Sequence, residues 1–433
     1  MCGLAPASLD VLLLMVELRR SKKSDEYNPK LEGDPDNEAI DTGKIETKKP
    51  YAQQRPANTA LRQQRLKAWH PILTHSTVLP LLFGLGVFFA VLGAVMYWSA
   101  LQVNELTIQY STCRDEAPQN NLAPIPSKYV SYRFHSSNKS MYENPPQWSK
   151  TPVPPGPGRE DNPARFNCTL YFTIPAQMDS SVFLYYKLTN FYQNHRRYMK
   201  SIDSEQLLSK PRTADQLQDA ECKPLGKDPV SGLSVYPCGL IANSVFNDTF
   251  QSPVLLDQNN QPQSTYEMSE NNIIWSGEAK RYRTPTYSAN DVVPPPFWQG
   301  AEGPFGYPSG RYEEGKLFDP SKNEHFQVWM RTAAFPTFRK LYMRNDTAPM
   351  QAGRYSLLVG DNYPVDMYGG TKSIVISTAS WIGGRSFMIG LSHIAVAALC
   401  FALGIVLTAK QIIKPRRVGD TSFLSWNKPH KQH

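Results

Sequence analysis

The glycine-rich segment at residues 369–373, Gly-Gly-Thr-Lys-Ser, has the residue types of a phosphate-binding loop. In such a loop, backbone N–H groups cradle the phosphates, and a lysine that directly follows a glycine reaches them. Here a threonine separates the last glycine from Lys372, and the upstream glycine spacing does not fit. We therefore predict a β-turn that leads into a strand, rather than a nucleotide site.

Other catalytic patterns are also missing from the sequence. It contains no His-Glu-x-x-His and no Gly-x-Ser-x-Gly motif. His135, His195 and His325 are far apart in the chain, and the adjacent Glu313 and Glu314 lie in a glycine-rich stretch that is typical of a solvated turn. We predict no enzyme activity, no cofactor and no metal site.

Two long segments of the chain are strongly apolar and contain no charged residue. Residues 68–104 contain no Asp, Glu, Lys or Arg over 37 positions, and residues 386–409 contain none over 24. A membrane-spanning helix needs about 20 mostly apolar residues to cross a hydrocarbon core of about 30 Å. Buried core helices are seldom so long or so uniformly apolar. We predict transmembrane helices at residues 78–101 and 386–409.

Basic residues beside these segments predict the orientation. Residues 48–67 hold six Lys or Arg and no acid, and residues 410–433 hold six against Asp420. Basic residues close to a span are retained on the cytosolic side. Both termini are therefore predicted to be cytosolic, in an integral protein of the endoplasmic reticulum, Golgi/endosomes or plasma membrane.

The net charge of +8 follows the same division. It separates into +2 for residues 1–67, +1 for residues 105–385 and +5 for residues 410–433. The excess lies next to the membrane, where it fixes orientation and attracts anionic lipids of the cytosolic leaflet. It does not indicate a nucleic-acid partner.

Six regions follow from these patterns. They are a disordered cytosolic tail (1–54), a basic juxtamembrane segment (55–77), a first transmembrane helix (78–101), an exoplasmic domain (105–385), a second transmembrane helix (386–409) and a basic cytosolic tail (410–433).

The predicted exoplasmic domain carries the signs of an oxidising compartment. Its four cysteines allow two disulfides in three connectivities, of which the sequential pairing Cys113–Cys168 and Cys222–Cys238 is the most economical. All four Asn-x-Ser/Thr sites fall here, and we expect glycosylation at Asn138, Asn167, Asn247 and Asn345.

The sequence predicts that this domain is mainly antiparallel β structure, β-sandwich-like with long loops. Segments rich in aromatic and β-branched residues predict strands at 168–174, 181–192, 325–330, 355–359 and 372–377. The proline-rich stretches 151–158 and 293–297 predict long loops, and residues 204–208 predict a short helix.

Small residues recur every four positions in both apolar segments. Gly86, Ala90 and Ala94 share one helix face in the first, and the second holds the pairs Ser386/Gly390 and Ala398/Ala402. Such faces allow close helix approach. Two helices cannot enclose a transport path, but they can pack against a larger membrane protein.

Several sequence blocks carry a family resemblance. They are residues 55–71 (RPANTALRQQRLKAWHP), 194–201 (NHRRYMKS), 237–248 (PCGLIANSVFND), 328–342 (VWMRTAAFPTFRKLY) and 381–384 (WIGG). Together they resemble the cell-division-control-protein-50/ligand-effect-modulator family. Its members are the non-catalytic β-subunits of type IV P-type ATPases, the phospholipid flippases.

The resemblance implies a heterodimer with the ATPase α-subunit, which supplies the phosphorylated aspartate and the lipid path. It also implies a role in endoplasmic reticulum exit, stability and activity of the pump. We expect partner contacts from residues in both compartments: Arg55, Asn58, Arg62, Gln63, Arg65, Trp69, Arg331 and Arg339. For Arg331, Arg339 and Lys340, internal ion pairing is the competing interpretation, and core packing is favoured for Trp329, Phe335 and Phe338. A two-span cell-surface receptor or adhesion protein is the alternative function.

Overall fold

The computed structural model describes residues 59–66, 74–134, 144–153, 165–219, 221–300, 303–415, 421 and 424–427. The chain divides into two units, Met1–Ile72 and Leu73–His433, and residues 59–66 belong to the first.

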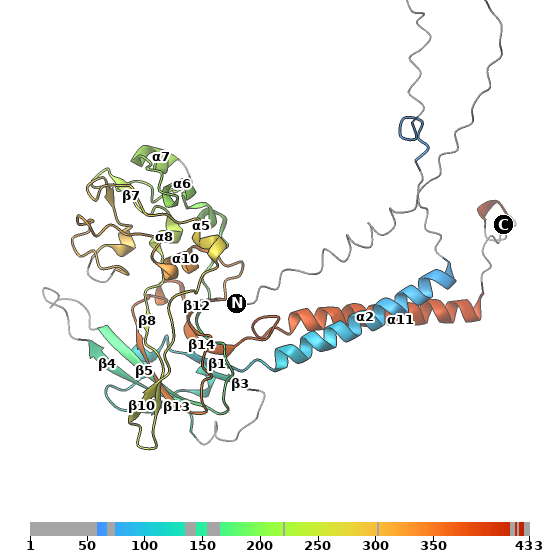
Figure 1. The fold of residues 1–433 in the computed structure, drawn as a ribbon, viewed down its shortest axis with the longest axis horizontal. Coiled ribbons are helices and arrows are strands. Elements are labelled where there is room, and N and C mark those ends of the chain that lie inside the picture. Colours follow the sequence, from blue (N-terminus) through green and yellow to red (C-terminus); the bar gives the residue numbers. More distant parts are fainter. Residues whose placement is uncertain are drawn as a thin grey trace, which may run out of the picture. The chain divides into compact units, whose positions relative to one another are not determined.

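Helices α2 (His75–Leu101) and α11 (Met388–Ile413) are each long and apolar enough to cross a membrane. They lie side by side (Figure 1), and most of their large apolar side chains are exposed. Where they meet, glycines of one helix face side chains of the other. A Cβ atom at Gly86 would lie 3.1 Å from the Phe401 ring, and one at Gly404 would lie 3.0 Å from the Phe83 ring. Small residues therefore set the close approach, as predicted for Gly86 and Gly390. The prediction is wrong for Ala94, Ala398 and Ala402, which are exposed, because the buried small residues recur every seven positions: Gly86 and Gly93 in α2, and Gly390, Ala397 and Gly404 in α11.

The strands between these helices form two larger antiparallel sheets within the described residues. The first has the order β12-β6-β14-β1-β3. The second has the order β10-β9-β13-β5-β4-β2, with β8 also paired to β13. Their bounds are β1 (Glu105–Gln109), β2 (Ala123–Pro124), β3 (Val130–Arg133), β4 (Gln147–Val153), β5 (Arg165–Ile174), β6 (Val182–Leu188), β8 (Thr249–Phe250), β9 (Val254–Leu256), β10 (Pro262–Thr265), β12 (Phe338–Asn345), β13 (Gly353–Gly360) and β14 (Lys372–Thr378).

Both sheets contribute alternate side chains to one core, as expected for half-buried strands. In β6, Val182, Leu184, Tyr186 and Leu188 are buried and the residues between them are partly exposed. Strand β13 alternates in the same way and adds Tyr355, Leu357 and Val359 to the core. We call residues 105–385 the β domain.

Short elements complete the β domain. They are α3 (Cys113–Glu116), α5 (Arg196–Lys200), α6 (Ser204–Leu207), α7 (Ala214–Asp219), β7 (Ser234–Val235), α8 (Leu240–Asn243), α9 (Ser276–Ala279), β11 (Val292–Val293), α10 (Glu324–Met330) and the 3₁₀ turns η1 (Ser127–Tyr129), η2 (Pro296–Trp298) and η3 (Asp366–Tyr368). The elements labelled α5, α6, α7, β7, α8 and α10 in Figure 1 gather beyond the two larger sheets. A further 3₁₀ turn, η5 (Ser425–Asn427), follows α11.

The two transmembrane helices join the β domain through neighbouring strands. Strand β1 begins four residues after α2 ends, and β14 precedes α11. These strands pair in antiparallel register, with Glu105 opposite Ser377 and Gln109 opposite Ser373. The chain therefore enters and leaves the domain at one point of the first sheet.

The prediction of a strand at residues 325–330 is wrong, because this segment is helix α10. Its first turn is capped by the Asn323 side chain, which accepts a hydrogen bond of 2.7 Å from the Phe326 N–H. All residues from Phe326 to Met330 are buried. Since the segment is buried on every side, its hydrophobic pattern could not separate a helix from a strand.

The proline-rich stretches also hold more regular structure than expected. Residues 151–153 belong to β4, where Pro152 lies opposite Phe166 of β5. Strand β2 pairs only with the beginning of β4, at Gln147 and Trp148. Pro152 therefore occupies a strand position with a partner on one side, which a residue without an N–H tolerates. Val293 likewise belongs to β11.

We predict that Gly93→Val weakens the packing of α2 against α11. A Cβ atom at Gly93 would lie 2.8 Å from Ile394 Cγ1 and 2.9 Å from the Gly390 carbonyl oxygen, whereas one at Gly84 has nothing within 4 Å. The expected destabilisation is about 1–3 kcal/mol, measured as a lower midpoint of thermal unfolding for the full chain in detergent. Gly84→Val is the matched control. Equal midpoints for both variants would contradict this packing.

Candidate functional site

The lysine of the glycine-rich segment is buried and engaged inside the β domain. Its strand, β14, starts directly after a turn in which Gly369 adopts a left-handed conformation with φ of 62°. The prediction of a turn leading into a strand is therefore confirmed. The Lys372 side chain is 2% exposed, and its Nζ lies 2.8 Å from Asp248 Oδ2. The same ammonium also donates to Asp361 and, over 2.7 Å, to the Tyr363 carbonyl oxygen.

The two carboxylates of this cluster have further partners. Asp248 Oδ1 accepts hydrogen bonds of 2.6 Å from the N–H groups of Asn362 and Tyr363, and its Oδ2 accepts one of 2.7 Å from the Tyr110 hydroxyl. Burial raises the pKa of Asp361, although the Lys372 ammonium acts against this shift. Burial also raises the pKa of Tyr110 well above its usual value, so that its hydroxyl stays a donor. We call Tyr110, Asp248, Asp361 and Lys372 the buried charge cluster.

A second buried lysine organises the end of helix α10. Lys340 Nζ donates to the carbonyl oxygens of Val328 (3.1 Å), Trp329 (2.6 Å) and Arg331 (2.7 Å). Burial lowers the pKa of Lys340 well below its usual value. These carbonyls are among the last of the helix, which have no partner within it. Lys340 therefore ends α10 and fixes the start of the following segment.

Three sequence blocks that are far apart in the chain converge around α10. Trp329 Nε1 donates to the Ile241 carbonyl oxygen over 2.9 Å, which joins block 328–342 to block 237–248. Gln193 Oε1 accepts a hydrogen bond of 2.8 Å from the Ala333 N–H. Asn194 Nδ2 donates to the Ala334 carbonyl oxygen over 3.0 Å. The loop 332–337 is thereby held beside the loop that leads into α5.

These adjoining segments carry exposed aromatic and basic side chains. Phe335 is 73% exposed, so its predicted place in the core is wrong. Tyr192 and Met199 are also exposed, as are Arg196 and Arg197 of helix α5. We call these five residues the aromatic–basic face. By contrast, the predicted core position of Trp329 is confirmed, since this side chain is fully buried.

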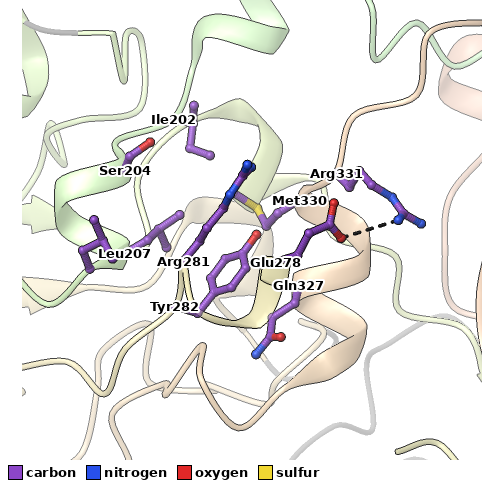
Figure 2. A pocket seen from close by; sticks show the side chains of 10 residues that line it. Ile202, Ser204, Leu207, Glu278, Arg281, Tyr282, Gln327, Met330 and Arg331 are labelled. Carbon is purple, nitrogen blue, oxygen red and sulfur yellow. Dashed lines mark hydrogen bonds and ion pairs between the residues drawn. The ribbon is translucent and has the colours of Figure 1, made fainter. Parts of the chain in front are cut away.

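Arg331 lines a cavity of about 310 Å³ beside this region (Figure 2). Its Nη1 lies 3.5 Å from Glu278 Oε2, and Figure 2 shows this pair at one side of the cavity. Further cavity residues are Ile202, Ser204, Leu207, Leu208, Arg281, Tyr282, Gln327 and Met330. Arg339 also pairs internally, with its Nη1 2.7 Å from Glu105 Oε2. Both arginines thus have carboxylate partners inside the chain, while partner binding stays a prediction for them.

The remaining predicted partner residues lie before α2. Residues 59–66 form an exposed turn, in which the Gln63 N–H donates to the Thr59 carbonyl oxygen over 2.9 Å. The turn carries Arg62 and Arg65. Arg55, Asn58 and Trp69 lie outside the described residues.

The cysteines and glycosylation sites are distributed across the β domain. Cys113 bonds to Cys168, which joins α3 to β5, and Cys222 bonds to Cys238 in a smaller apolar cluster with Leu217, Val235 and Val293. Asn167 and Asn247 are partly exposed. Asn345 is also partly exposed, and its Nδ2 donates to the Glu267 carbonyl oxygen over 2.7 Å. Asn138 lies outside the described residues.

Sequence reasoning missed the buried charge cluster. Two signals could have found it: Lys372 lies two residues before the apolar strand core Ile374–Ile376, and Asp361 directly follows the alternating strand β13. A charged residue that borders a buried strand requires a partner. The identity of that partner, Asp248, depends on a contact across more than a hundred residues. In the described part of the chain, no group of three or more His, Cys, Asp or Glu side chains is arranged to hold a metal ion.

The helices, sheets and disulfides define a class: a membrane protein in which two apolar helices flank a large, antiparallel, disulfide-bonded β domain. Residues 96–417 match the model of the LEM3 (ligand-effect modulator 3) family / CDC50 family, and the chain belongs to this family. The resemblance seen in the sequence blocks is therefore confirmed.

Its relatives include named accessory subunits. The chain is 36% identical over 398 residues to the phospholipid-transporting ATPase accessory subunit CDC50 of Chaetomium thermophilum, covering 90% of this chain and 95% of the relative. It is 38% identical to accessory subunit CRF1 of Saccharomyces cerevisiae, covering 86% of this chain and 89% of the relative. Identity to cell cycle control protein 50A of Mus musculus is 34%, covering 82% and 88%.

Replacing Lys372 with Met tests the buried charge cluster. The variant should lose about 3–5 kcal/mol of unfolding free energy at about pH 7.5, because two buried carboxylates lose their cation. Burial raises the pKa of Asp361, and the Lys372 ammonium no longer acts against this shift in the variant, so the folded variant takes up a proton more readily than the unfolded chain. The stability deficit should therefore shrink as the pH falls from about 7.5 to about 5.

Thermal unfolding midpoints across this pH range check that prediction. The matched control is Lys322→Met, since the Lys322 side chain is 80% exposed. A deficit for Lys372→Met that matches the control, or that grows toward low pH, would show that the cluster does not have this role.

Proposed function

We propose that this chain is the non-catalytic accessory subunit of a type IV P-type ATPase that translocates phospholipids to the cytosolic leaflet. One observation carries the proposal: the family match over residues 96–417, together with relatives named as accessory subunits of phospholipid-transporting ATPases. The ATPase supplies the phosphorylated aspartate and the lipid path. This chain supports the exit of the pump from the endoplasmic reticulum, its stability and its activity.

The contacts of two buried lysine side chains agree with a non-catalytic role. Lys372, the one residue that suggested phosphate chemistry, holds Asp248 and Asp361 together in the core. Lys340 is occupied by the carbonyl oxygens at the end of α10. Both ammonium groups are therefore engaged by oxygen atoms of the chain itself and hold the fold in place.

The proposed orientation places both termini in the cytosol and the β domain on the exoplasmic side. Basic residues before α2 and after α11 support this orientation. The two disulfides agree with an oxidising compartment. Glycans at Asn138, Asn167, Asn247 and Asn345 belong to the same proposal. The complex resides in the endoplasmic reticulum, Golgi/endosomes or plasma membrane.

Three regions make the proposed contact with the ATPase. The aromatic–basic face meets exoplasmic loops of the pump, since exposed aromatic and arginine side chains are typical of interface anchors. Helices α2 and α11 pack on its membrane domain through exposed faces. The segment from Arg55 to Trp69 runs along the cytosolic side of the ATPase. It includes Asn58, Gln63 and Arg65, and it binds acidic side chains of the ATPase or lipid phosphates. Arg331 and Arg339 add contacts beyond their internal ion pairs.

The cytosolic contact is tested by charge reversal. Arg62→Glu with Arg65→Glu should reduce the amount of ATPase that co-purifies with the full chain by about tenfold, because two attractive charges become repulsive. The charge-preserving pair Arg62→Lys with Arg65→Lys is the control and should retain most of the complex. An undiminished complex with the Glu pair would remove this contact from the proposal. Failure of the wild-type chain to capture any ten-span ATPase would overturn the function itself.

The exoplasmic contact is tested at Phe335. Phe335→Ser should weaken binding of the ATPase by about thirtyfold, which corresponds to the loss of about 2 kcal/mol at an exposed aromatic anchor. The control Val230→Ser removes an apolar side chain that is 94% exposed elsewhere on the β domain. Because both side chains are exposed, both variants should keep the wild-type unfolding midpoint. Equal binding by the two variants would exclude Phe335 from the interface.

A further inference from the structure

A cavity of about 260 Å³ lies where α2 and α11 join the β domain. It is lined by Met96 and Ala100 of α2, Arg339 of β12, Ser380, Ile382, Gly384, Arg385 and Ser386 of the segment before α11, and Ile389 of α11. We call it the junction cavity. Its lining combines two guanidinium groups and two hydroxyls with an apolar side formed by the helices.

The positive charge of this cavity exceeds the negative charge beside it. Glu105 is already paired with Arg339 over 2.7 Å. Arg385 Nη1 donates to the carbonyl oxygens of Val103 (2.9 Å) and Arg133 (3.0 Å), which carry no charge. The Nε of Arg385 is buried and has no hydrogen-bond partner within the described chain. A buried donor without a partner is costly, and an anion in the cavity would satisfy it.

The local sequence offers no second acid to neutralise Arg385. No Asp or Glu occurs at residues 367–419, and none occurs at residues 68–104. Arg385 also lies at the end of α11 opposite to the basic C-terminal tail. Within the described residues Arg385 has no carboxylate at ion-pair distance, so an anion from outside the chain would complete its contacts.

Two exposed tryptophans indicate the depth at which the cavity lies in a membrane. Trp381 is 74% exposed at a tight turn, in which the Ser380 N–H donates to the Gly383 carbonyl oxygen over 2.8 Å. Trp98 is 61% exposed and lies between two cavity residues in α2. Tryptophan concentrates at the depth of lipid head groups. The cavity therefore opens where the phosphates of one leaflet lie.

The apolar side of the cavity continues into the membrane-spanning helices. Met388 is exposed on the first turn of α11, and Ile389 follows within the cavity lining. The amino end of α11 also carries the positive pole of the helix dipole. An anionic head group at the arginines would therefore place its acyl chains along an apolar helix surface.

We propose that the junction cavity binds the phosphate group of a glycerophospholipid from the leaflet at the amino end of α11. Arg385 and Arg339 face the phosphate oxygens, and Ser386 supplies a hydroxyl donor, whereas the Ser380 hydroxyl already donates to the Gly383 carbonyl oxygen. Guanidinium groups match phosphate geometry well. The proposal requires that α2 and α11 span the membrane, and it does not require the ATPase.

The charges also define which head groups fit best. Glu105, the acidic residue beside the cavity, is bound to Arg339 and is not free to receive a lipid ammonium. A zwitterionic head group such as phosphocholine would bring its cation to two arginines. Lipids with a net negative head group, such as phosphatidylglycerol, should therefore bind more tightly than phosphatidylcholine.

The test uses the full chain purified in a non-ionic detergent and native mass spectrometry to count retained lipids. Phosphatidylglycerol, phosphatidylcholine and inorganic phosphate are titrated separately at equal concentrations. We expect retention of one phosphatidylglycerol per chain, and about tenfold weaker binding for Arg385→Gln, because a charge-assisted contact to phosphate is lost. Since Arg385 also bonds to backbone carbonyls, Ser386→Glu serves as a second variant. It adds a carboxylate at an exposed position and should weaken binding similarly.

Lys410→Gln is the matched control, because it removes one positive charge at the other end of α11. It should leave phosphatidylglycerol binding unchanged. Equal retention of phosphatidylcholine and phosphatidylglycerol, or no effect of Ser386→Glu in a chain with the wild-type unfolding midpoint, would overturn the proposal. Equally tight binding of inorganic phosphate would assign the site to a free anion instead. Lipid retention seen only in complex with the ATPase would assign it to the protein interface.

Discussion

The contact between the Lys372 ammonium and the carboxylates of Asp248 and Asp361 holds the β domain in register. Lys372 begins β14 in the first sheet, Asp361 follows β13 in the second, and Asp248 directly precedes β8, which pairs with β13. Apolar side chains from both sheets pack in any of several slightly shifted arrangements. The buried ions accept only one, because any other arrangement leaves a charge without its partner. The cluster therefore specifies how the sheets face each other more than it adds to stability.

The same principle extends to the surfaces proposed for binding. The loop that carries Phe335 has no regular structure, yet Gln193, Asn194 and Lys340 hold it through hydrogen bonds to backbone atoms. An exposed aromatic anchor on a fixed loop loses little conformational entropy when a partner binds. Hydrogen bonds beneath the surface thus hold the loop of the aromatic–basic face in one conformation before a partner binds.

The sequence predicts those parts of the structure that depend on local pattern. The two apolar helices are evident from uncharged runs, and the strands β5, β6, β13 and β14 from alternation or β-branched content. The turn at Gly369 follows from its glycine pair. Helix α10 is missed because a segment buried on all sides loses its periodic signature, and only the Asn323 cap signals its start.

Long-range pairing accounts for the rest of what sequence reasoning missed. Nothing near Lys372 in the chain identifies Asp248 as its partner, because sheet topology alone brings them together. Phe335 looked like a core residue because aromatic side chains usually are. It is exposed because it lies in the loop 332–337, whose backbone, rather than the Phe335 ring, makes the contacts with Gln193 and Asn194. The candidate contact residues near α2 were found by family resemblance, since no local physical pattern marks them.

The pairing of β1 with β14 has a mechanical consequence for the membrane helices. A force that separates α2 from α11 acts on this strand pair at one end, where Glu105 faces Ser377. Hydrogen bonds loaded from one end of a strand pair break one after another. They therefore break at a much lower force than bonds that are all loaded at once. Lys372 lies just beyond the far end of this strand pair, where its contacts with Asp248 and Asp361 connect the two sheets. The charge cluster therefore adds its contacts at the end of the pair that is loaded last.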